Sequence, residues 1–263
     1  MSENDPVELQ PVPPPPAKPV EVVEEPQMSE ASMIGNVFIE PGRVFEDQRR
    51  KPRFILAGII MVIAISVFQV LFIQKFGLEK IVRARMETSS RTADLPTDQK
   101  EKIIAQQSGD VAKYITFGIT PVAILISFLI GGLFYWLGSN AVGGTSRYFH
   151  GVAVWIYAGL PPALVFTLAN IIVMMLKDPD TIDLATAQQG LVKANLGFFV
   201  NAKAMPVVAA LLGSIDLFAI WGWVLASIGL QKVAKISSGA AWAIVLIVGL
   251  IGVGFKVAGA MFF

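Results

Sequence analysis

Five long intervals without charged side chains constrain this chain more than any other feature. The 263 residues include 21 Lys and Arg and 20 Asp and Glu, and these charges are concentrated between the intervals. The intervals, interrupted only by Asp216, are 54–74, 114–146, 148–176, 204–231 and 236–255. A helix rises about 1.5 Å per residue, so about 20 apolar residues cross a hydrocarbon core of ~30 Å. Each interval is therefore long enough for one crossing and too short for two crossings with a loop.

The intervals predict an all-α integral membrane protein built as a five-helix transmembrane bundle. Backbone groups in lipid must be hydrogen-bonded within the segment, and this requirement favours helices. The composition agrees, because 16% of the residues are charged, against roughly 25% in soluble domains. We expect a membrane domain over 54–263, with spans near 54–74, 114–137, 150–176, 208–230 and 239–261.

The first 31 residues differ from the rest in composition. They hold eight of the 16 prolines and seven acidic residues. Such a segment cannot bury a core, so we predict a disordered Pro-rich tail over 1–31. Its function is either that of a ligand for a proline-recognition domain or that of a solvated spacer, and the composition favours the spacer.

Residues 32–53 are predicted to form an interfacial basic juxtamembrane segment. Apolar residues recur at helical spacing on both sides of Pro41: Met33, Ile34, Val37, Phe38, Val44 and Phe45. This spacing predicts short amphipathic turns that lie in the membrane interface. A basic cluster follows directly before the first span and is expected to meet anionic headgroups or to set the orientation: Arg49, Arg50, Lys51 and Arg53.

The distribution of basic residues gives a mixed indication of orientation. With the N-terminus inside, nine Lys and Arg residues would lie inside and twelve outside. This count slightly favours the opposite orientation. The basic cluster directly before the first span nevertheless favours an N-terminus inside, because charges beside the first span usually dominate. We expect the N-terminus in the cytoplasm and the C-terminus outside.

The two longer connections carry helical patterns of their own. In 75–113, two apolar stripes are separated by Pro96, which predicts a helical hairpin at the membrane surface. In 177–206, apolar residues from Leu184 to Phe199 predict a mildly amphipathic helix.

Three polar residues inside or beside the spans are functional candidates: Asp216, Lys256 and Asn170. An intramembrane acid is costly and often functional. Asp216 either forms part of a proton or ion site, pairs with Lys256 in the antiparallel fifth span, or stabilises a helix N-terminus. Asn170 is a possible polar lining group in the third span.

Two consecutive prolines, Pro161 and Pro162, lie in the middle of the third span. Each removes a backbone hydrogen bond, so the pair predicts a kink or a break. A break would suit a transporter site, whereas a kink would only shape the packing of the helices.

Small residues at four-residue spacing indicate close helix contacts. The pairs are Ala209 with Gly213, Gly222 with Ala226, and Gly254 with Ala258, together with the adjacent Gly131 and Gly132. Such faces allow self-association or contact with protein partners. The bilayer is the one partner that the composition requires, and no nucleic-acid partner is expected.

Several chemistries are excluded or lack a signature. Cysteine is absent and His150 is the only histidine, so a disulfide, a thiol centre and a site of two histidines are impossible within one chain. No nucleophile elbow or phosphate-binding loop is present. We predict no catalytic, cofactor-binding or metal-binding residue and no enzymatic activity. His150 is expected to be a solvated interfacial residue.

An ordered set of short motifs resembles the Yip (Ypt-interacting protein) domain family in its prokaryotic branch. The motifs are Pro41-Gly-Arg-Val-Phe45, Leu95-Pro-Thr-Asp-Gln99, Gly143-Gly-Thr-Ser-Arg-Tyr148, Tyr157-Ala-Gly-Leu-Pro161 and Ile215-Asp-Leu-Phe-Ala-Ile-Trp221. The resemblance covers about 34–263. It implies five helices and a cytoplasmic N-terminus, here in a prokaryotic plasma (inner) membrane, and it suggests that Asp216 supports the shared fold.

Two functions follow as hypotheses. The first is a non-enzymatic multi-pass membrane protein that organises membrane or partner proteins. The alternative is a small transporter or channel that uses Asp216 and the kinked third span. A polar path from water to the Asp216 carboxylate would favour transport, whereas burial of that carboxylate against Lys256 or a backbone N–H would weaken it.

Overall fold

The computed structural model describes residues 25–262 except 90–91, 93–94, 188–189 and 202–203. The predicted all-α class is confirmed, since the described residues form helices and loops without a named strand. The predicted number of spans is also confirmed. Within the part of the chain that the structure describes, five helices are long and apolar enough to cross a membrane: α3 (Ile55–Phe76), α7 (Asp110–Ala141), α8 (Tyr148–Leu176), α11 (Leu217–Ala234) and α12 (Ser238–Phe262). Most of the predicted tail, 1–24, lies outside the described residues.

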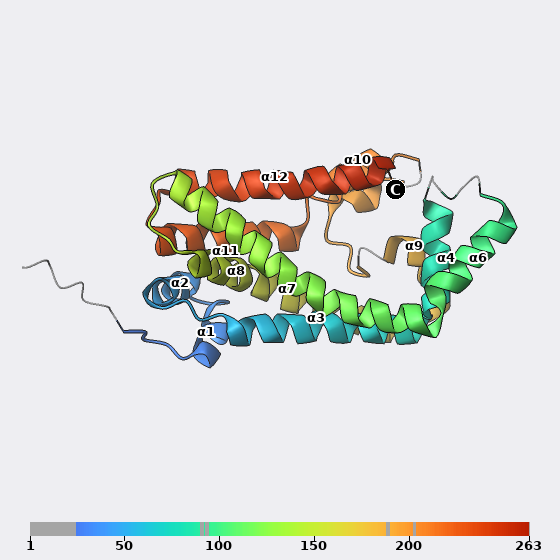
Figure 1. Cartoon of the computed structure of the whole chain (residues 1–263), viewed down its shortest axis with the longest axis horizontal. Coiled ribbons are helices and arrows are strands. Elements are labelled where there is room, and N and C mark those ends of the chain that lie inside the picture. The colour runs from blue at the N-terminus through green and yellow to red at the C-terminus, as the bar shows by residue number, and fades with distance from the viewer. Residues whose placement is uncertain (1–24, 90–91, 93–94, 188–189, 202–203, 263) are drawn as a thin grey trace, which may run out of the picture.

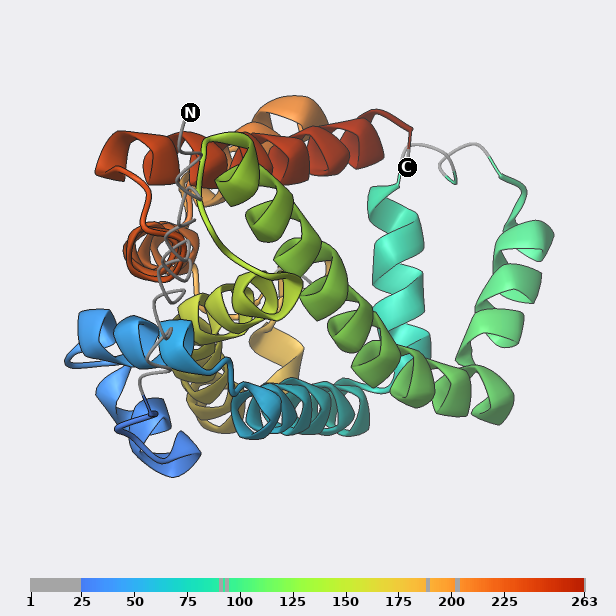
Figure 2. The same cartoon turned by 60° about the vertical axis from the view of Figure 1, so that its left-hand side comes forward.

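The remaining helices gather at the two ends of this bundle (Figure 1). At the end where α3 begins, α1 (Glu30–Asn36) packs against α2 (Pro41–Arg50) and α3, and α2 packs against α8 and α11. Four short helices lie toward the opposite end: α4 (Leu78–Thr88), α6 (Thr97–Ser108), α9 (Leu184–Ala187) and α10 (Pro206–Leu212). The turned view in Figure 2 shows the α4–α6 hairpin standing away from the rest of the bundle.

Helices α7 and α8 make the closest contact in the bundle. A Cβ placed on Gly132 would lie 2.7 Å from the Cα of Val152, and one on Gly151 would lie 2.3 Å from the carbonyl oxygen of Gly132. Only residues without side chains allow backbones to approach this closely. The small-residue pattern at Gly131 and Gly132 therefore serves contact within the chain.

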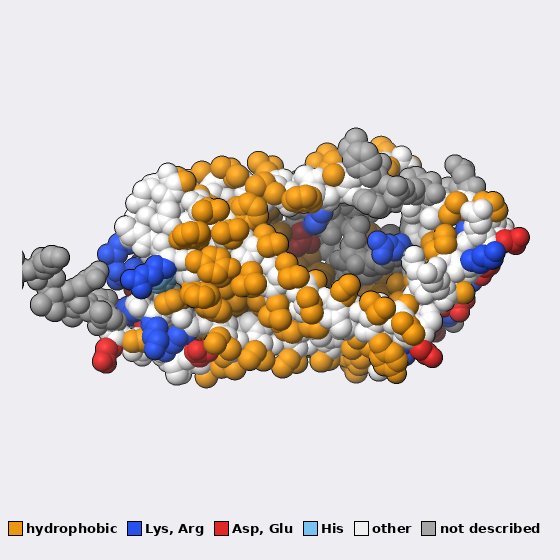
Figure 3. Space-filling model, in the orientation of Figure 1, with side chains coloured by type: hydrophobic (Ala, Val, Ile, Leu, Met, Phe, Trp, Pro, Cys, Tyr) orange, Lys and Arg blue, Asp and Glu red, His pale blue; other side chains and the backbone are white. Residues whose placement is uncertain are grey.

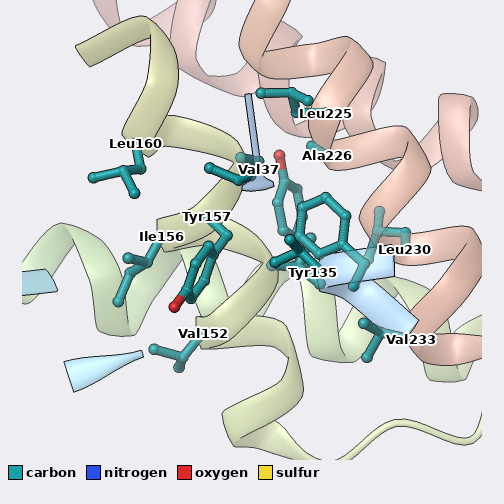
Figure 4. Close-up of a cluster of buried hydrophobic side chains, with 14 of the residues drawn as sticks. Val37, Tyr135, Val152, Ile156, Tyr157, Leu160, Leu225, Ala226, Leu230 and Val233 are labelled. Carbon is teal, nitrogen blue, oxygen red and sulfur yellow. The ribbon is translucent and has the colours of Figure 1, made fainter. Parts of the chain in front are cut away.

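The core lies where α8, α11 and the N-terminal helices meet. Tyr157 and Leu160 of α8 and Leu230 of α11 are almost completely buried there. Figure 4 shows Val37, which follows α1, among side chains of α8 and α11. The N-terminal segment is thus part of the core of the bundle.

Helix α8 continues through Pro161 and Pro162 without an interruption. Both prolines are buried. The break that would have suited a transporter site is therefore not present in this helix.

The fourth predicted span is divided in the structure. Residues near its predicted start, 208, belong to α10, and the crossing helix α11 begins only at Leu217. The division occurs because Asp216 accepts hydrogen bonds from the first free N–H groups of α11, and so sets the N-terminus of that helix.

The two connections differ in how well their patterns predict the structure. The 75–113 segment forms the expected hairpin, in which Arg83 of α4 donates to Glu101 of α6 over 2.6 Å. Hydrogen bonding from the Arg83 guanidinium lowers the pKa of the Glu101 carboxyl. The single helix expected over 184–199 is wrong, because the described residues of this range form α9, a loop and a 3-10 turn. Gly190 between them has a φ of +114°, which a helix cannot include.

Candidate functional site

The carboxylate of Asp216 caps the N-terminus of α11. Its Oδ1 accepts from the backbone N–H of Phe218 over 2.8 Å and from that of Ala219 over 3.1 Å. The backbone of Asp216 also forms an isolated bridge with Asn195. Such a cap satisfies helix donors and places a negative charge at the positive end of the helix dipole.

Lys256 lies on α12 and is exposed at the rim of a cavity. Among the described residues, no carboxylate forms an ion pair with its Nζ, and the structure does not bring it together with Asp216 in such a pair. The predicted pairing of Lys256 with Asp216 is therefore not seen in the structure.

Asn170 is fully buried and joins α8 to the loop after α9. Its Oδ1 accepts from the backbone N–H groups of Leu191 and Val192, and its Nδ2 donates to the Phe166 carbonyl over 2.7 Å. All of these bonds are internal to the protein. Asn170 thus positions a loop and does not present its amide to a polar pathway.

We expect Asn170→Ala to lower the free energy of unfolding by about 1–3 kcal/mol, because two backbone donors lose their buried acceptor. The loop should also open more often, so trypsin should cleave after the neighbouring Lys193 faster than in the native protein. Unfolding in detergent–SDS mixtures and timed proteolysis measure the two effects. Asn201→Ala, which truncates an exposed amide, is the control. Equal effects of the two variants would contradict this role.

A buried carboxylate that sequence reasoning missed lies in the N-terminal segment. Asp47 of α2 is 1% exposed. It accepts from the side chains of Arg50 and Arg53 and from the backbone N–H groups of Gln27, at 2.6 Å, and Met28, at 3.3 Å. We call this arrangement the Asp47 clamp. It ties the chain before α1 and the chain after α2 to one side chain.

Gln48 extends the clamp. The side chain is completely buried, donates from Nε2 to the Arg53 carbonyl over 2.6 Å, and accepts at Oε1 from the Arg53 N–H over 2.7 Å. The burial of Asp47 and Gln48 could have been predicted from the sequence, since they follow the apolar Val44 by three and four positions. Those positions share the buried face of a helix, so a polar residue there needs partners inside the protein.

Two members of the basic cluster also bind a side chain within the protein. The side chains of Arg50 and Arg53 are each 18% exposed and neutralise Asp47. Lys51 is exposed. The backbone carbonyl of Arg49 lies 3.2 Å from Nε2 of His150, whose Nδ1 accepts from the backbone N–H of Arg147. His150 therefore bridges α2 and the start of α8.

The apolar stripe of the N-terminal segment packs against protein. Met33, Val37, Val44 and Phe45 have no exposed surface. The predicted boundary between tail and juxtamembrane segment, at 31 and 32, falls inside α1. Helices α8 and α11 pack against α2, whereas α1 packs against α2 and α3. A sequence pattern requires this burial but cannot say which helices provide it.

The outer surface of α1, α2 and the loop between them forms what we call the N-terminal platform. Ile39 is 80% exposed there. Glu46 is bound by Lys232 of α11 over 2.6 Å, and this hydrogen bond lowers the pKa of the Glu46 carboxyl. The platform is therefore fixed to the membrane domain at its rim as well as through the buried clamp.

A cavity of about 450 Å³ lies between α3, α7, α8, α11 and α12. Its walls are mainly apolar and include Met61, Phe128 and Trp155. Figure 3 shows a hollow on one face of the bundle between α12 and α7, with hydrophobic side chains around it and both acidic and basic side chains within or beside it. The cavity is lined by four of the small residues of the bundle: Gly159, Gly222, Gly249 and Gly252.

Comparison with known proteins agrees with the resemblance found in the motifs. Residues 35–258 match the Yip1 domain. The chain is also similar to the membrane protein YknW of Bacillus subtilis, with 25% identity over 215 residues, which covers 81% of this chain and 84% of the relative. No solved structure matches. The Yip1 match begins within α1 and thus includes α2 with Asp47, the four spans α3, α7, α8 and α11, and most of α12.

Proposed function

The chain belongs to the Yip1 domain family, and from this premise we propose that it organises partner proteins at the membrane without catalysing a reaction. The N-terminal platform is the surface that would hold such a partner. We further propose that the platform lies on the cytoplasmic side of a prokaryotic plasma membrane. The basic cluster beside the first span and the bacterial relative support this placement.

The observation that carries the proposal is the Asp47 clamp. Removing a carboxylate from water costs several kcal/mol unless it is paired and hydrogen-bonded. Here the Asp47 carboxylate is bound by two guanidinium groups and two backbone N–H groups. These ion pairs and hydrogen bonds hold α1 and α2 in one position on the bundle. A protein bound to the platform would therefore have a defined position relative to the membrane helices.

The alternative, a transporter or channel, has less support. Both prolines of α8 lie in a continuous helix, and the Asp216 carboxylate accepts from backbone N–H groups. An acid that is needed for a helix cap is poorly suited to repeated protonation or ion exchange. A liposome flux assay that compares the native protein with Asp216→Asn tests the alternative, and a specific loss of flux in the variant would favour transport.

We expect a photo-crosslinking residue at Ile39 to form a discrete protein adduct in native membranes, because this side chain is 80% exposed on the platform. The same residue at Phe199, which is 80% exposed toward the opposite end, should not form that adduct. Asp47→Asn should abolish the adduct by releasing the platform, whereas Glu79→Gln, which removes an exposed ion pair with Arg83 on α4 toward the opposite end, should preserve it.

Removal of 1–24 separates the contribution of the tail from that of the platform. The adduct at Ile39 should persist without the tail if the platform itself binds the partner. An adduct that survives Asp47→Asn, or crosslinks to lipid alone, would overturn the proposal.

A further inference from the structure

We propose that the cavity between the five spans binds an acyl chain of an anionic phospholipid, with the lipid phosphate at Lys256. This binding site is independent of the N-terminal platform, because its walls come from the five membrane helices and from Ser214, shortly before α11. The proposal rests on the chemistry of the walls, the residues that keep the cavity open, and the position of the lysine.

The walls of the cavity suit a hydrocarbon chain. The volume of about 450 Å³ lies within the usual range for small-molecule sites, roughly 300–1,000 Å³. Apolar side chains such as Phe128, Trp155 and Val245 make up most of the lining, and the few polar groups include Ser127 and Ser214. Ser127 already donates to the carbonyl oxygen of Ile124, and Ser214 to that of Ala210. An apolar space beside lipid is therefore better filled by a lipid tail than by a polar solute.

Glycine keeps the cavity open on the side of α12. A Cβ on Gly249 would lie 3.0 Å from the ring of Trp223, so this helix already sits as close to α11 as its side chains allow. A Cβ on Gly252 would have no neighbour within 4 Å. A larger residue at 252 can therefore enter the cavity without displacing a helix. Gly254 also has open space around it but does not line the cavity, so it offers a matched control on the same helix.

Lys256 provides the charge that selects the headgroup. It lines the cavity, and among the residues that the structure describes no acidic side chain pairs with it. It lies six residues before the end of α12, which is about 9 Å along a helix axis. A flexible lysine at that depth reaches the headgroup region, where a phosphate would supply the missing negative charge. A zwitterionic lipid brings its own cation, so the lysine favours an anionic one.

Quenching of tryptophan fluorescence tests the acyl chain, because Trp155 and Trp223 line the cavity. The full-length protein in detergent micelles is titrated with phosphatidylglycerol that carries brominated acyl chains. We expect saturable quenching that Gly252→Leu weakens by about tenfold in affinity, equivalent to about 1.4 kcal/mol. Gly254→Leu should leave it unchanged. Thermal unfolding of the two variants checks that both remain folded.

Headgroup selection is tested with Lys256→Gln. This variant should reduce the preference for brominated phosphatidylglycerol over brominated phosphatidylcholine and retain quenching by both. Lys113→Gln, which changes a lysine of α7 that does not line the cavity, should keep the native preference. Equal quenching of the Gly252 and Gly254 variants would overturn the cavity as the binding site, and an unchanged headgroup preference in Lys256→Gln would overturn the assignment of the phosphate.

Discussion

Asp47→Asn is expected to lower the free energy of unfolding by about 3–5 kcal/mol, the usual effect of removing one partner from a buried ion pair. The substitution keeps the shape of the side chain and removes its charge. Arg53 would remain mostly buried without a counter-ion, and the N–H groups of Gln27 and Met28 would lose their charged acceptor. The α1–α2 unit should then detach from α8 and α11 before the spans separate.

Two measurements resolve this order. Unfolding in detergent–SDS mixtures gives the change in free energy, and limited trypsin digestion after Arg49, Arg50 and Arg53 reports detachment. Glu40→Gln is the matched control, because its partner Arg43 and Glu40 itself are exposed, with side-chain exposures of 66% and 48%. Exposed pairs contribute about 0–1 kcal/mol. If the two variants unfold alike, the Asp47 clamp does not hold the platform.

Gly151→Ala should destabilise the bundle by about 3 kcal/mol, near the upper end of the usual effect of overpacking. The added methyl would lie 2.3 Å from the carbonyl oxygen of Gly132 and 2.9 Å from the backbone nitrogen of Trp136. Backbone atoms cannot rotate away as a side chain can, so α7 and α8 must separate. Midpoints of thermal unfolding in detergent and the yield of folded protein measure the loss.

Gly118→Ala serves as its control. Gly118 lies on α7, and a Cβ there would have no neighbour within 4 Å. Alanine also favours a helix over glycine by about 0.8–1 kcal/mol in peptides, so stability should be unchanged or slightly higher. If Gly118→Ala lowered stability as much as Gly151→Ala, the effect would come from replacing any glycine in these helices. The close contact between α7 and α8 would then not explain it.

The apolar intervals allowed the fold class and the number of crossing helices to be predicted. Helix ends were less predictable, since they depend on polar residues whose partners are set locally. Helix α7 begins at Asp110, before the charge-free interval. Helix α11 begins after the predicted start of its span, because Asp216 caps it. Gly190, with its positive φ, likewise interrupts a segment for which apolar spacing alone predicted a continuous helix.

The candidate site was predictable only in part. Lys256 was identified from the sequence as a candidate residue, but the cavity beside it requires five helices to be placed together. Asn170 was noticed as polar, whereas its bonds to Leu191 and Val192 depend on a loop 21 and 22 residues later. Asp47 was missed because it lies among basic residues that suggest a solvated surface.

The sequence by itself determined that five apolar helices cross the membrane, because the cost of placing charge in lipid fixes where the chain can cross. The tertiary structure decided which acid is buried. Asp47 is enclosed because α8 and α11 cover the face of α2 that carries Val44 and Phe45, and this contact joins residues far apart in the chain. Desolvation by lipid depends on local composition, whereas desolvation by protein depends on which helices meet.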